Sequence, residues 1–82
     1  MLHIGLDRVV LRRDIVMILD AQRDMQADTK QFLQSIQQAG HRVFCDKPKS
    51  VVVVKIGDRL MAYDSPISAA TLLKRGSIHI PE

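Results

Sequence analysis

Four consecutive valines, Val51 to Val54, restrict the possible folds of this 82-residue chain more than any other feature. They belong to the stretch SVVVVKIGDRLMAYD, in which two apolar runs flank Gly57-Asp58. Glycine tolerates positive φ, so this pair predicts the turn of a β-hairpin. A strand without polar alternation normally has both of its faces covered. The valine run therefore predicts a strand at the centre of the molecule.

Shorter apolar pieces surround this hairpin in the sequence. Three of them fill the first 20 residues, at 2–6, 9–11 and 15–19, and are separated by Asp7-Arg8 and by Arg12-Arg13-Asp14. This spacing predicts short strands joined by tight, charged turns. The third piece is continuously apolar between two aspartates, so we expect both of its faces to be covered. Residues 41–46 predict one more short strand.

Two segments have a helical pattern. In residues 28–39, apolar side chains fall on one face and Gly40 is suited to end the helix; Asp24 and Asp28 both remain candidates for its N-cap. The second helix is short, begins after Ser65 or Ser68, carries Lys74 and Arg75 near its C-terminus and stops at Gly76.

This order of elements predicts an α+β fold: a small, mostly antiparallel sheet with one main helix and a short C-terminal helix, forming a single domain over residues 1–82. A chain of this length buries only roughly 60 to 65% of its unfolded surface. Two helices offer little cover for the continuous apolar strands. We therefore expect a homo-oligomer with Val51, Val52, Val53 and Val54 at the subunit interface.

The sequence contains no recognisable catalytic or metal-binding pattern. His3, His41 and His79 are scattered, with no metal-ligand spacing. Cys45 lies four residues from His41, which is roughly 13 Å along a strand and too far for a hydrogen bond. The four glycines are isolated, so they form no phosphate-binding loop. We predict no enzyme, no metal and no cofactor.

The expected environment is the cytoplasm. No basic, apolar, small-residue leader opens the chain, and no apolar run approaches 18 residues. We therefore predict no membrane association. A single cysteine also excludes an intramolecular disulfide.

Three basic doublets remain as candidate binding groups: Arg12-Arg13, Lys47 with Lys49, and, secondarily, Lys74-Arg75. Each also has a purely structural interpretation, as a turn, as protection of a strand edge, or as a partner of the helix dipole. The formal net charge is +3 and the pI is near 9.4, which favours an anionic partner. Only three aromatic residues are available to stack on bases, so double-stranded DNA contacted at its phosphates fits better than a single strand.

The segments RRDIVMILD, KPKSVVVV and YDSPISAATLLKRG together resemble the small bacterial extracellular matrix regulators, the Rem family, and are most similar to its B branch. The similarity runs from about His3 to Ile80. It implies a DNA-binding transcriptional regulator of extracellular matrix and biofilm genes, associated with the nucleoid. It also implies protomers like LytTR DNA-binding domains, assembled into a ring with DNA around a basic rim.

Carried over by position, the resemblance places Arg13, Lys47 and Lys49 at the DNA. The A branch has a denser arginine cluster before the valines, where this chain has Asp46 and two lysines around Pro48. Lysine is a point charge without a bidentate fork, so phosphate contact is expected rather than base reading. The alternative hypothesis is an assembly protein that works with a paralogous regulator and binds little DNA of its own.

Overall fold

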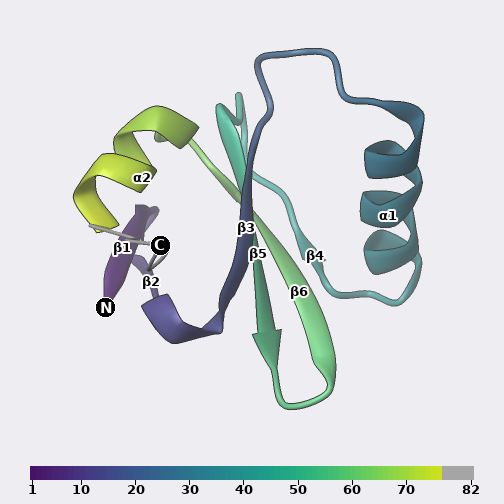
Figure 1. The fold of residues 1–82 in the computed structure, drawn as a ribbon, viewed down its shortest axis with the longest axis horizontal. Helices are drawn as coiled ribbons and strands as arrows, with labels where there is room; N and C mark the ends of the chain where they lie inside the picture. Colours follow the sequence, from purple (N-terminus) through teal and green to yellow (C-terminus); the bar gives the residue numbers. More distant parts are fainter. Residues whose placement is uncertain (77–82) are drawn as a thin grey trace, which may run out of the picture.

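The computed structural model describes residues 1–76 and has an α+β fold with two sheets and two helices (Figure 1). Its elements in chain order are β1 (Leu2–Gly5), β2 (Arg8–Val10), the 3-10 turn η1 (Arg12–Asp14), β3 (Ile15–Asp20), α1 (Ala27–Gln38), β4 (Arg42–Val43), β5 (Ser50–Ile56), β6 (Arg59–Ser65) and α2 (Ala69–Gly76). The predicted fold class and order of elements are confirmed. His79 lies outside the described residues.

The main sheet has four strands in the order β3-β5-β6-β4. β5 pairs antiparallel with both β3 and β6, as expected for a mostly antiparallel sheet. β4 is shorter than predicted, with only two residues, and pairs parallel with β6. β1 and β2 form a separate two-stranded hairpin. The valine strand is therefore internal, while β3 lies at an edge of the sheet.

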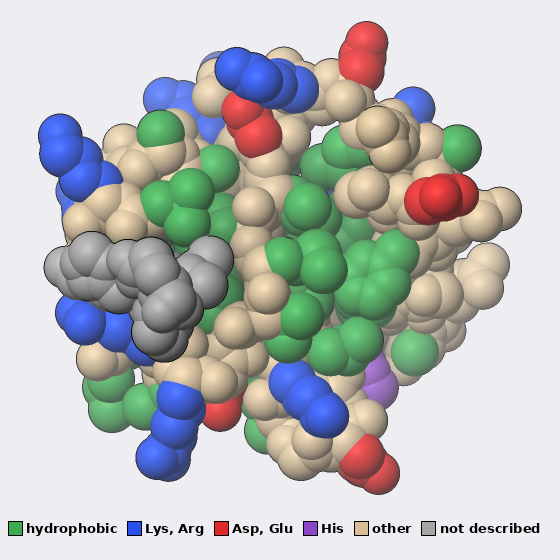
Figure 2. All heavy atoms as spheres, in the orientation of Figure 1, with side chains coloured by type: hydrophobic (Ala, Val, Ile, Leu, Met, Phe, Trp, Pro, Cys, Tyr) green, Lys and Arg blue, Asp and Glu red, His purple; other side chains and the backbone are tan. Residues whose placement is uncertain are grey.

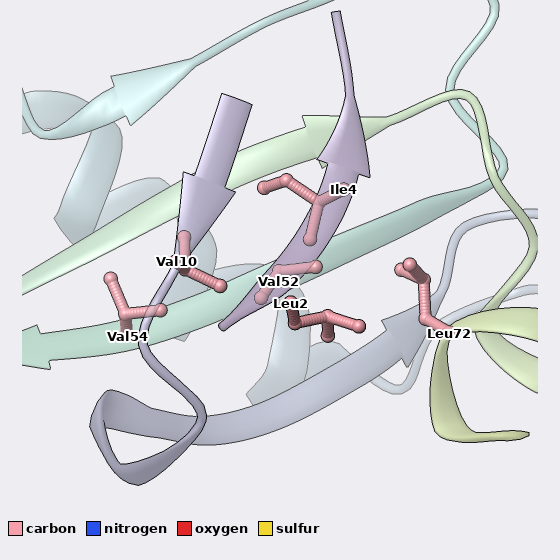
Figure 3. Packing of buried hydrophobic residues seen from close by; sticks show 6 residues of the cluster. All are labelled: Leu2, Ile4, Val10, Val52, Val54 and Leu72. Atoms are coloured by element: carbon pink, nitrogen blue, oxygen red, sulfur yellow. The ribbon is translucent and has the colours of Figure 1, made fainter. Parts of the chain in front are cut away.

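The four valines of β5 alternate between two apolar cores. Val52 and Val54 point to the hairpin-side core, where they meet Leu2, Ile4, Val10 and Leu72 (Figure 3). Val51 and Val53 point to the α1-side core, made with Leu33, Ile36 and Ala62. The β1–β2 hairpin and α2 cover one face of the sheet, and α1 covers the other (Figure 1).

This double cover corrects the prediction that Val51 to Val54 form a subunit interface. The four side chains are 0–1% exposed within one chain, so a second copy has no access to them. The missing cover comes from the hairpin, which the sequence pattern did not place over the sheet. Ser65 fastens it there, since its buried Oγ donates a 2.7 Å hydrogen bond to the Ile4 carbonyl.

The prediction that both faces of the 15–19 segment are covered is met only in part, because the side chains of β3 pack on both cores without being fully enclosed. β3 has no fully buried residue, and Val16 is 49% exposed. The reason is its position at the sheet edge, where the flanking layers only partly enclose its side chains. A register shift between Ile15 and Met17 leaves Val16 without a partner on β5.

The tight turns agree with the sequence at one hairpin and differ at the other. Gly57-Asp58 connects β5 to β6, with Gly57 at φ +64°, as predicted. The first hairpin turns at Leu6-Asp7 instead of Asp7-Arg8, and both residues have positive φ. That combination is typical of a type I′ turn, which favours asparagine and glycine.

The predicted helix ends are confirmed at two points. Gly40 has φ +78° after α1. Gly76 is the last described residue of α2, so the predicted stop after it lies outside the described residues. Ser68 caps α2, because the Thr71 N–H donates to its Oγ at 3.2 Å. At the start of α1 the cap residue is Gln26, which makes no side-chain cap hydrogen bond, so neither aspartate considered from the sequence serves there.

Candidate nucleic-acid interface

The loop before β5 holds Lys47 and Lys49 on a fixed backbone. The Lys49 N–H donates to the Ser65 carbonyl at 2.8 Å, and its carbonyl accepts from the Ala21 N–H at 3.0 Å. Lys49 is thus tied to the segments that continue both neighbouring strands of β5. Both lysine side chains are exposed. The backbone of Lys49 is therefore held from both sides, while that of Lys47 is not.

Lys47 itself has an unusual conformation, with φ +52° immediately before Pro48. A non-glycine residue in the left-handed region costs roughly 1–2 kcal/mol. The proline fixes the next φ, so the short loop has few alternative paths. The positive φ of Lys47 turns the chain toward β5, and the Lys47 side chain remains in solvent.

A buried ion pair lies behind this loop and joins it to the sheet. Arg42 on β4 donates to the Asp64 carboxylate on β6, at 2.6 Å from Nη2 and 3.1 Å from Nε. The second carboxylate oxygen accepts from the Cys45 N–H at 3.3 Å. The guanidinium also lies 4.6 Å from the Phe44 ring centroid. Sequence reasoning missed this cluster, because no local spacing connects residues 42 and 64.

Arg12 and Arg13 lie in η1, immediately before β3, and their side chains are exposed. The turn is closed by the Asp14 N–H, which donates to the Leu11 carbonyl at 3.0 Å. In the antiparallel register, Ile15 pairs with Val54 and Asp20 pairs with Ser50. The arginines and the lysines therefore occupy opposite ends of the β3–β5 pair.

The two doublets therefore do not form one continuous cluster at a single end of the sheet. The five-residue step from Ile15 to Asp20 corresponds to roughly 17 Å of extended strand, so the doublets do not converge on one point. The cations nearest to the arginine turn in the pairing register are instead the exposed Lys55 and Arg59. They flank the Gly57-Asp58 turn, and that position is the signal that could have identified them.

Lys74 and Arg75 are exposed in the last turn of α2. α2 starts near the lysine end of the sheet, after Ser65, and continues beside β1 (Figure 1). The secondary doublet thus belongs to the layer of the hairpin and not to that of α1. Figure 2, in the view of Figure 1, shows Lys and Arg side chains at the left, top and bottom of the molecule and apolar side chains near its centre.

The candidate cations form no ion pair with any acidic residue that the structure describes. Within residues 1–76, ion pairs join only Arg42 to Asp64 and Arg23 to Asp20. All of the following are exposed and outside these pairs: Arg12, Arg13, Lys47, Lys49, Lys55, Arg59, Lys74 and Arg75. Their charges are therefore available to an external anion.

Cys45 has none of the features of a nucleophile. It is half-buried, and burial raises the pKa of its thiol, which the carboxylates of Asp64 and Asp46 raise further. Its backbone N–H, not its sulfur, is the group tied to Asp64. The thiol therefore stays protonated at neutral pH.

Other candidate sites in the described part of the chain are weaker. No group of three metal-binding side chains gathers within residues 1–76. An open hollow of about 400 Å³ lies between α1 and β4, lined by Lys30, Leu33, Gln34, Gln37 and Arg42. No helix in this range has both the length and the apolar character needed to cross a bilayer.

Comparison with protein-family models, with curated proteins and with solved structures found no match to this chain.

Proposed function

We propose that this protein is a non-catalytic, homo-oligomeric regulator that binds double-stranded DNA through exposed lysines and arginines. The observation that supports it best is the set of exposed cations at both ends of the β3–β5 pair, none of which has an acidic partner in the described part of the chain. Phosphates are the ligands that such isolated charges suit, because they require charge and reach rather than a shaped pocket.

The spacing of the two doublets is compatible with a duplex. DNA carries one negative charge per roughly 1.7 Å of helix axis when both strands are counted, so cations roughly 17 Å apart can each meet a phosphate of the same duplex. Arg12 and Arg13 would hold one segment of the backbone, and Lys47 and Lys49 another. Lys74 and Arg75 add a secondary contact.

Repetition of the protomer would strengthen these contacts. A few cations per chain give weak, salt-sensitive binding, whereas several linked copies gain effective concentration for each additional contact. A ring of LytTR-like protomers with DNA along its basic rim, controlling matrix and biofilm genes in the cytoplasm, is the assembly implied by the resemblance to the Rem regulators.

The matched pair Lys49→Gln and Lys30→Gln tests the proposal. Both residues are exposed lysines. Lys30 lies on α1, which covers one face of the sheet, and not in the loop before β5 that holds Lys49. Binding to a fluorescent 30-base-pair duplex is measured by anisotropy at several salt concentrations. Lys49→Gln should make the slope of log K against log salt less negative by about 0.9, while Lys30→Gln leaves it unchanged. Equal slopes for both variants would contradict the proposal.

The second candidate function is an assembly protein that joins copies of itself or a paralogous regulator and contacts little DNA. The observation that favours it is the exposed apolar edge strand β3. It predicts that Lys47→Glu/Lys49→Glu leaves partner binding intact. Under the first proposal, the same variant loses DNA and keeps its oligomeric state.

A further inference from the structure

The edge of the sheet at β3 combines three properties of an interaction surface. It is six residues long and has a strand partner on one side only. Its residues 15–19 contain no charged or polar side chain. Its apolar side chains are half-buried or exposed, whereas the neighbouring valines of β5 are 0–1% exposed.

The surroundings of β3 do not close over it. Ile15 and Ile18 pack on the hairpin-side core, and Met17 and Leu19 pack on the α1-side core, all as partly buried residues. Figure 2 shows the result as an apolar surface at the centre of the face on which β3 lies in front in Figure 1. An added strand would cover side chains on both faces and satisfy the outward backbone groups of β3.

The opposite edge of the sheet is protected by comparison. β4 has only two residues and is anchored by the Arg42–Asp64 ion pair. Short, charged edge strands are a common means of preventing strand addition. β3 carries one irregularity, at Val16, but pairs regularly with β5 from Met17 to Asp20, so this part of β3 is the open edge.

We propose that β3 pairs antiparallel with the β3 strand of a second copy, which joins two four-stranded sheets across a two-fold axis. The charges at the strand ends support this occupant. Counted along the β3 segment alone, residues 12–14 before the strand carry two arginines and one aspartate, a net +1, and residues 20–24 at its end carry Asp20, Arg23 and Asp24, a net −1. Lys47 and Lys49 lie at the same end as Asp20, but beside β5, one strand further from the open edge. Antiparallel self-pairing brings the Arg12-Arg13 turn of each copy next to Asp20 of the partner strand, twice per dimer.

This inference deepens the oligomeric part of the proposed function and is independent of DNA binding. The pairing leaves Val51 to Val54 inside each protomer and uses an exposed strand instead. It also places the Arg12-Arg13 turns of two copies at opposite ends of one joined strand pair. A β3-linked dimer is thus a unit from which a larger assembly can grow through other surfaces.

Sedimentation equilibrium without DNA tests the inference on a matched pair of variants, Val16→Lys and Val9→Lys. Val16 and Val9 are 49% and 48% exposed, and only Val16 lies on β3. Val16 has no partner on β5, so its replacement leaves the β3–β5 pairing in place, which far-UV circular dichroism verifies. The dimer dissociation constant should rise by about tenfold or more for Val16→Lys and stay unchanged for Val9→Lys.

A mixing experiment tests the antiparallel arrangement. Arg13→Glu and Asp20→Lys should each weaken self-association by about tenfold, since each places like charges at both ends of the pair. An equimolar mixture of the two variants should regain dimers near the wild-type level, because opposite charges then meet at both ends. A monomeric wild-type chain, Val16→Lys dimers of wild-type strength, or a mixture without recovery would each overturn the inference. Since no DNA is present, these results stand apart from any loss of DNA binding.

Discussion

The Arg42–Asp64 ion pair offers the sharpest prediction about stability, and Asp64→Asn is the change that isolates it. The Asp64 side chain is 2% exposed and that of Arg42 is 12% exposed, so neither charge is well hydrated. Removal of one partner from a buried pair costs about 3–5 kcal/mol, because it leaves the other charge uncompensated. Arg42 retains a route to solvent and its contact with Phe44, so the lower end of that range applies, about 3 kcal/mol.

The magnitude is large compared with the stability of such a small domain, about 4–12 kcal/mol for 82 residues. It corresponds to a melting temperature lowered by about 12–24 °C. The measurement is urea unfolding followed by far-UV circular dichroism. Asp20→Asn is the matched control, because its partner Arg23 is exposed and lies 3.5 Å away, and it should cost less than about 1 kcal/mol.

The double variant Arg42→Met/Asp64→Leu separates the pair from its two halves. Apolar side chains of similar volume can replace a buried ion pair with little loss, so the double variant should be less destabilised than Asp64→Asn. Its remaining cost, about 1–2 kcal/mol, comes from the Cys45 N–H, which loses its acceptor. The reasoning is refuted if Asp64→Asn costs less than about 1 kcal/mol, or if the double variant is as unstable as the sum of the single changes.

Three further changes test other parts of the account. Gly5→Ala should lower the free energy of unfolding in urea by about 2 kcal/mol. Gly5 has φ +92°, and an added Cβ would lie 3.0 Å from Pro66 Cδ. An unchanged midpoint of urea unfolding would show that the hairpin can shift to make room. Lys47→Gly should weaken DNA binding and leave stability equal or up to about 1 kcal/mol higher, since glycine tolerates φ +52°; a clear loss of stability would contradict the strain assigned to Lys47. Alkylation of Cys45 should show a higher apparent pKa in the folded chain than in urea. Folding keeps this thiol protonated, so its contribution to stability should fall as pH rises past the unfolded pKa, and Cys45→Ala should remove that alkaline loss.

The sequence predicts the elements of this fold better than their packing. Val51 to Val54 and Gly57-Asp58 specify the β5–β6 hairpin through local chemistry, and the periodicity of 28–39 specifies α1. The position of the β1–β2 hairpin over β5 depends on contacts between residues far apart in the chain, such as Ser65 with Ile4. No local pattern encodes such contacts, and the valines were therefore assigned to a subunit interface.

For the candidate site too, the sequence predicts which residues are exposed but not how they are arranged in space. Exposed basic side chains are visible as doublets in the sequence, and their exposure is confirmed. Their placement at opposite ends of the sheet follows from the antiparallel pairing of β3 with β5, which adjacent charges in the sequence do not reveal. The Arg42–Asp64 support behind the lysine loop was missed for the same reason, since a parallel strand pair of two residues has little sequence signal.

The measurement that tests the central claim most directly is the salt dependence of binding to duplex DNA by the wild-type protein. Contacts from Arg12, Arg13, Lys47 and Lys49 to one phosphate each predict a slope of about −3.6 in log K against log salt per protomer. Affinity should therefore fall by more than a hundredfold between about 50 and 200 mM salt. An affinity that stays flat over this range, or no binding at 50 mM, would contradict the account.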